Sequence, residues 1–123
     1  MLWRWASVGP RMELQQYALM NPGIRKLKSA SLRVARPSGL PHEMQEHMRE
    51  LIDMHAANQR KGHATALLKS VCKEADADWL TLMVQVQPFD DGMDMDKLKR
   101  WYERLGFVEV QAQPVILMVR SPR

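Results

Sequence analysis

The sequence contains a single cysteine, Cys72, so the chain can form no intrachain disulfide. That usage suits a reducing cytoplasm, where we expect the protein to act. No apolar run approaches the roughly 20 residues of a transmembrane helix. The start, MLWRWASVGPRMELQQ, also lacks the continuous apolar stretch of about 7 to 15 residues that a secretory signal requires. We therefore expect a cytoplasmic protein with no membrane segment.

Metal-ligand patterns are also missing. The four histidines lack the spacing and the Cys or carboxylate partners of a zinc site. The aspartates at positions 90, 91, 94 and 96 do not meet the Gly and terminal Glu positions of an EF-hand loop. We predict no bound metal, and we interpret Cys72 as a small core residue.

The 123 residues allow one domain with a single modest core. Residues 1–123 are predicted to form it, with 1–20 either included or left as a disordered or atypical extension. The 18 Lys and Arg against 14 Asp and Glu give a net charge of +4. This excess favours a polyanionic ligand, which can be a phosphate-bearing cofactor, nucleic acid or an acidic protein surface.

The first half of the chain is broken by Pro and Gly, and within it residues 29–35, SASLRVA, predict one strand. Residues 42–56 are ambiguous. Their apolar positions fit either helical spacing or one face of a strand, and the local pattern prefers the helix.

The second half predicts a regular order of elements. Apolar residues recur at intervals of three and four from 62 to 76, which indicates an amphipathic helix that packs on a sheet. WLTLMVQVQP alternates apolar and polar residues up to Pro88, as a strand does. Asp94 can cap a second helix that Gly106 ends, and FVEV and PVILMVR then predict two strands of a hairpin.

The segment NQRKGHATALL leads into the first of these helices through two cations and Gly62. The unpaired N–H groups of a helix start attract anions, and a glycine lets an anion approach the main chain. The segment is neither a P-loop nor a dinucleotide fingerprint. It predicts a pyrophosphate cradle, with a turn glycine among solvated charges as the alternative.

Two signatures here resemble the GNAT superfamily of N-acetyltransferases. Its acetyl-CoA loop has Gln or Arg, two residues, Gly, one residue, then Gly or Ala, which Gln59, Gly62 and Ala64 match. The later LKRWYERLGFVEV is similar to its second signature, and the two are separated by one helix and one strand, as the superfamily requires. The stretch from PFDDGMD to LMVR is also similar to small acetyltransferase-like proteins encoded by bacteriophages.

The resemblance implies an α/β (α+β) fold, with flanking helices and a mixed central sheet whose parallel strands splay apart around the pantetheine arm. It favours extended structure at residues 50–56 and leaves 42–48 helical. The N-terminal part must be reduced, because few residues precede the matched region, which runs from about 51 to 120.

The implied reaction is acetyl transfer from acetyl-CoA (coenzyme A) to an amine by direct attack on the thioester. Main-chain groups near 54–56 would pair with pantetheine and supply an N–H for the oxyanion, while His63 and Thr65 would either bind phosphate or stay exposed without a role. The cofactor-binding residues are therefore expected to be Met54, Ala56, Gln59, Arg60, Lys61, Gly62, His63, Ala64 and Thr65.

Tyr102 matches the superfamily tyrosine that protonates the leaving thiolate, and its alternative role is a core aromatic. The general base stays open among Glu50, Asp53 and His55. If the strand alternates, Asp53 and His55 share one face and Glu50 lies on the other.

A different class of function stays open too: a non-catalytic GNAT-fold binding protein that uses a basic surface on nucleic acid or on a host protein complex. IRKLK and RWYER are short for a nucleic-acid patch, and a charged outer face explains them more simply, so we do not favour nucleic acid as the partner. The acceptor amine can be a small molecule or a protein. Exposed strand edges also make a homodimer possible.

Overall fold

The computed structural model describes residues 20–56, 62–88 and 94–123 of the chain. In these residues the predicted order of strand, helix, strand, helix and two strands from residue 48 onward is confirmed. The elements are β1 (Gly23–Leu27), β2 (Ala30–Ala35), α1 (His42–Gln45), β3 (Met48–Ala56), α2 (His63–Ala77), β4 (Thr81–Gln85), α3 (Met95–Arg104), β5 (Val108–Gln111) and β6 (Leu117–Arg120).

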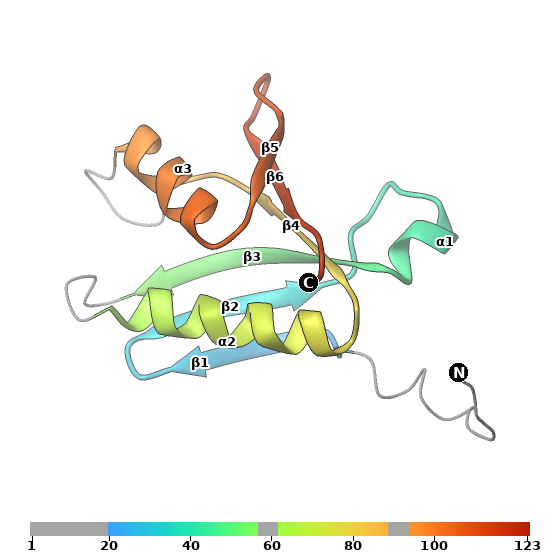
Figure 1. Cartoon of the computed structure of the whole chain (residues 1–123), viewed down its shortest axis with the longest axis horizontal. Helices are drawn as coiled ribbons and strands as arrows, with labels where there is room; N and C mark the ends of the chain where they lie inside the picture. The colour runs from blue at the N-terminus through green and yellow to red at the C-terminus, as the bar shows by residue number, and fades with distance from the viewer. Residues whose placement is uncertain (1–19, 57–61, 89–93) are drawn as a thin grey trace.

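The six strands of the described residues form one sheet in the order β1-β2-β3-β4-β6-β5 (Figure 1). β3 and β4 run parallel, because α2 carries the chain back to the end of the sheet from which β3 started. All other neighbouring strands are antiparallel. The fold is thus a mixed α+β arrangement of a mostly antiparallel sheet flanked by helices.

The predicted amphipathic helix is α2, which lies along the sheet in Figure 1 and contacts β1, β2, β3 and β4. Burial raises the pKa of the Cys72 thiol, which is consistent with its interpretation as a core residue. No helix among the described residues is long and apolar enough to cross a bilayer. The buried face of α2 consists of Ala64, Leu67, Leu68, Val71, Cys72 and Ala75.

The sheet has a covered face and an open face. Side chains toward α2, such as Leu32, Leu51 and Leu82, are 3% exposed or less. Residues that alternate with them along the strands point to the open face. The side chains on this face are half-exposed or exposed. They are Ile24, Lys26, Ser31, Arg33, Ala35, Met48, Glu50, Ile52, Thr81, Met83, Gln85, Leu117 and Val119.

Two features of the N-terminal region were not predicted. The first is the edge strand β1, whose Arg25 forms an ion pair with Glu74 of α2 at 2.9 Å. The second is the buried Arg49, whose guanidinium donates hydrogen bonds to the carbonyls of Met20, Gln45 and Met48 at 2.9, 3.2 and 2.8 Å. Arg49 thereby fixes the chain entering β1 and the last residue of α1 to the start of β3.

Candidate active site

A pocket lies where the parallel pairing of β3 and β4 ends. The pairing runs from Met48–Thr81 to Leu51–Val84, whereas β3 continues to Ala56 beside β2. The pocket has a volume of about 400 Å³, within the usual range of small-molecule sites. Its lining consists of Leu51, Ile52, Asp53, Met54, Val84, Gln85, Gln87, Pro88 and Tyr102. Main chain of β3 beyond Leu51 therefore has a cavity, and not a strand, on its β4 side.

A β-bulge shapes the β3 wall of this pocket. The pairing with β2 passes from Arg33–Ile52 to Ser31–His55, so β3 has one residue more than β2 between the two pairs. Asp53 lies in the bulge with a φ of 54°, a left-handed conformation that is uncommon for residues other than glycine. Its carboxylate accepts a hydrogen bond from Arg33 Nε at 3.2 Å. Strained backbone of this kind clusters at functional sites.

The bulge corrects the expected distribution of the three candidate bases. An uninterrupted strand would put Asp53 and His55 on one face and Glu50 on the other. The extra residue instead brings His55 to the open face that Glu50 and Ile52 share. Of the three candidates, the pocket is lined by Asp53 and by neither Glu50 nor His55.

Tyr102 of α3 forms part of the opposite wall and is 2% exposed. Its ring packs against Trp101 and Phe107, with centroid distances of 4.9 and 5.4 Å. Burial raises the pKa of the phenol above its ordinary value near 10. Within the described part of the chain no hydrogen bond to its hydroxyl is formed. Tyr102 is thus both a core aromatic and a protonated phenol beside the pocket.

The described part of the predicted anion cradle consists of Gly62 and the first turn of α2. Gly62 precedes the helix with a φ of 73°, and a Cβ added to it would meet no atom within 4 Å. The carbonyl of Gly62 accepts from the N–H of Ala66, so the N–H groups of His63, Ala64 and Thr65 belong to the unpaired first turn. Gln59, Arg60 and Lys61 lie outside the described residues.

Other predicted cofactor residues have partners of their own. His63 Nδ1 accepts from the backbone N–H of Ser29 at 3.3 Å and lies 2.6 Å from Ser29 Oγ, which ties the start of α2 to the turn between β1 and β2. Ala64 is buried, Met54 lines the pocket, and Ala56 is buried opposite Ala30.

Thr65 is joined to α3. Its Oγ1 accepts a hydrogen bond from Trp101 Nε1 at 2.8 Å. The residue expected to bind phosphate therefore uses its hydroxyl oxygen to hold the helix that carries Tyr102.

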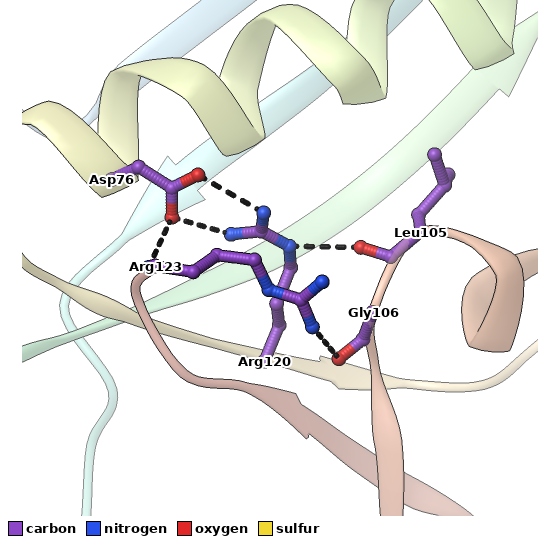
Figure 2. A network of polar contacts seen from close by, with 5 residues as sticks. All are labelled: Asp76, Leu105, Gly106, Arg120 and Arg123. Atoms are coloured by element: carbon purple, nitrogen blue, oxygen red, sulfur yellow. Dashed lines mark hydrogen bonds and ion pairs between the residues drawn. The ribbon is translucent and has the colours of Figure 1, made fainter.

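A polar network fixes the C-terminal end of α3, and sequence analysis did not identify it. Figure 2 shows Arg120 of β6 reaching Asp76 of α2 with both terminal nitrogens, at 2.7 and 3.0 Å, and donating from Nε to the carbonyl of Leu105 at 2.8 Å. Arg123 adds hydrogen bonds from its backbone N–H to Asp76 and from its side chain to the Gly106 carbonyl. Alternation along β6 places Arg120 on the same face as the buried Met118, but no local pattern indicates that Asp76 of α2 lies there to pair with it.

Comparisons with known proteins show the fold alone. No protein-family model matches the chain, and neither does any curated protein. Among solved structures, that of the anti-CRISPR protein AcrVA5 superposes with a TM-score of 0.64 at 16% sequence identity. The match covers 83% of this chain and 100% of that chain.

Proposed function

We propose that the protein is an acetyl-CoA-dependent N-acetyltransferase of the GNAT type, in which an amine attacks the thioester directly. The observation that carries this proposal is the end of the β3–β4 pairing after Leu51 and Val84, where a pocket opens beside the phenol of Tyr102. In this interpretation β3 and β4 are the splayed strands of the superfamily, and pantetheine lies between them.

The main chain of β3 supports the way in which the cofactor would be held. An extended ligand gains affinity by adding main-chain hydrogen bonds to an unpaired strand edge, and pantetheine carries two amides that can do so. The edge from Ile52 to Ala56 offers such groups on its β4 side. The diphosphate would then lie at the unpaired N–H groups after Gly62, where the helix dipole favours negative charge.

The residues around the pocket can divide the chemistry of acetyl transfer. The amine lone pair forms the new C–N bond, the carbonyl electrons move to oxygen, and an N–H of the bulged β3 would stabilise the oxyanion. The C–S bond then breaks, and the electron pair leaves with the thiolate. Tyr102 would donate a hydrogen bond, and finally a proton, to that sulfur.

Burial of Tyr102 determines how it would act. Its raised pKa keeps the phenol protonated throughout the neutral range, as a donor must be. A thiol, with a pKa near 8.5, is the stronger acid, so complete transfer from the phenol is uphill. Tyr102 would therefore contribute mainly by hydrogen bonding to the developing thiolate inside a poorly solvated pocket.

Asp53 is the best placed of the candidate bases, because it lines the pocket from the bulge. It would accept the proton that the amine loses, directly or through one water. Its ion pair with Arg33 is exposed, with side chains 48% and 72% accessible for Arg33 and Asp53. A contact of this kind adds little stability, and Asp53 can leave it at small cost.

Binding of acetyl-CoA is the first test of the proposed function. At about one hundred times its dissociation constant, a specific ligand raises the free energy of unfolding by about 2.7 kcal/mol. We expect acetyl-CoA and CoA to raise the melting temperature and acetate to leave it unchanged. Release of free thiol with a panel of amines and proteins then tests turnover. Absence of a shift with acetyl-CoA would contradict the proposal.

The name of the structurally similar protein favours a second candidate function. Because AcrVA5 is an anti-CRISPR protein, the present chain can be a protein of the same fold that binds a host protein complex without turnover. Exposed Lys26, Lys28 and Arg33 near the open face would serve such a contact. Binding to a host complex in the absence of any acetyl-CoA shift would favour this candidate.

A further inference from the structure

The two helices beside the candidate active site, α2 and α3, are joined at its cofactor end by a side-chain hydrogen bond. Thr65, in the first turn of α2, accepts a hydrogen bond from Trp101 Nε1 at 2.8 Å, across 36 positions of sequence. Both side chains are half-buried, so water competes only partly for this bond.

The contact reaches Tyr102 through one packed ring. Trp101 directly precedes Tyr102, and the two ring planes are inclined by 58°. Tyr102 also meets Phe107 edge-on at 68°. Because a close-packed buried ring can move only if its neighbours move, the position of the Trp101 indole limits that of the phenol.

A second tie lies at the far end of α2. Asp76 holds Arg120, which donates to the carbonyl of Leu105 just after α3 (Figure 2). Thr65 and Asp76 are separated by three turns of helix, about 16 Å at 1.5 Å per residue. Two ties this far apart fix the orientation of α3 relative to α2, and Tyr102 lies between their attachment points on α3.

We propose that Thr65 is a positioning residue for the phenol of Tyr102, through the hydrogen bond that its Oγ1 accepts from Trp101. This proposal rests on the proposed function, because it assigns Thr65 a role in the acetyl-transfer step. Through Trp101, the same helical turn whose N–H groups would hold the diphosphate also sets the place of the proton donor. Cofactor binding and the donor would then share one rigid element.

Replacement of Thr65 by valine and by serine tests this role. Thr65→Val keeps the branched shape and removes the acceptor, while Thr65→Ser keeps the acceptor. For Thr65→Val we expect a roughly ten- to hundredfold lower kcat for thioester consumption, because small misplacements of a catalytic group have effects of this size. The dissociation constant of acetyl-CoA should change by less than about twofold, and Thr65→Ser should restore most of kcat.

The Tyr102→Phe background separates positioning from a general loss of structure. If Thr65 acts through the phenol, Thr65→Val should lower kcat little further once the hydroxyl is gone. Equal fold-losses in both backgrounds, an unchanged kcat in Thr65→Val, or a tenfold weaker binding of acetyl-CoA would overturn the assignment. A wild-type protein that neither binds acetyl-CoA nor consumes it would overturn the proposed function as well, which distinguishes the two failures.

Discussion

Arg120 and Asp76 join strand β6 of the sheet to the C-terminal end of α2 through two hydrogen bonds, at 2.7 and 3.0 Å. Their side chains are 7% and 22% exposed, so the pair is largely removed from water. Breaking such a pair leaves one desolvated charge without compensation. Because Arg120 also holds the carbonyl of Leu105, the same side chain fixes the end of α3.

Removing the carboxylate charge of Asp76 should destabilise the protein strongly. We expect Asp76→Asn to lower the free energy of unfolding in urea by about 3 kcal/mol, the size typical of a broken buried pair. Glu74→Gln is the matched control on the same helix, because its pair with Arg25 is more exposed, at 38% and 23%. It should cost less than about 1 kcal/mol. If the two variants lost equal free energies of unfolding, burial of the ion pair would not determine its contribution to stability.

The same pair predicts a dependence of stability on pH. The ordinary pKa of an aspartate is near 3.9, and the hydrogen bonds from Arg120 hold the pKa of Asp76 below that value. A depressed pKa in the folded state stabilises the protein above the unfolded-state pKa, and this contribution is lost as the pH falls through the folded-state pKa. The stability difference between wild type and Asp76→Asn should therefore be constant near neutrality and shrink below about pH 4. A difference that grows in acid would contradict the assigned sign.

Gly106 should tolerate a methyl group less well than Gly39 does. Both have a positive φ, 97° and 78°, so Ala costs about 1–2 kcal/mol of backbone strain at either position. A Cβ at Gly39 meets nothing within 4 Å, whereas at Gly106 it would collide with the Arg123 guanidinium and lie 3.2 Å from Arg120 Nε. Arg123 can move aside, but Arg120 is held. We expect Gly106→Ala to lower the free energy of unfolding in urea by about 1 kcal/mol more than Gly39→Ala does. Equal losses would show that Arg120 and Arg123 move to accommodate the methyl group.

The elements that the sequence predicted well are those whose burial is one-sided. α2 buries every third or fourth residue, as its apolar spacing predicted, and Asp94 caps α3 by accepting from the N–H of Asp96 at 2.8 Å. The hairpin of β5 and β6 followed from alternation and its separating polar residues. In each case a local pattern and the tertiary environment favour the same structure.

The features that were missed depend on contacts distant in sequence. β1 is an edge strand whose Arg25 finds Glu74 only after folding, and Arg49 occupies a core position because three main-chain carbonyls compensate its charge. The bulge at Asp53 shifts the alternation of β3 by one residue, which no periodicity in the sequence shows. Thr65 was expected either to bind phosphate or to stay exposed without a role, and its hydrogen bond with Trp101 was not predicted because it depends on the placement of α3 beside α2.

Tyr102→Phe should separate chemistry from packing. The hydroxyl forms no hydrogen bond within the described residues, so its removal from a 2% exposed ring should leave the free energy of unfolding unchanged or slightly higher. Binding of acetyl-CoA in a thermal-shift titration should also persist. Thioester consumption should fall by about a hundredfold or more, the usual contribution of a positioned acid.

The pH profile of the wild type tests the same assignment without a mutation. Because burial raises the pKa of Tyr102 above 10, the phenol stays protonated and its ionisation should cause no loss of kcat up to about pH 10. A falling alkaline limb of kcat near pH 8 or 9, abolished in Tyr102→Phe, would mean that the pKa of the phenol is lowered during turnover, which would contradict the effect assigned to its burial. A limb that remains in Tyr102→Phe belongs to another group, and the phenol keeps its role.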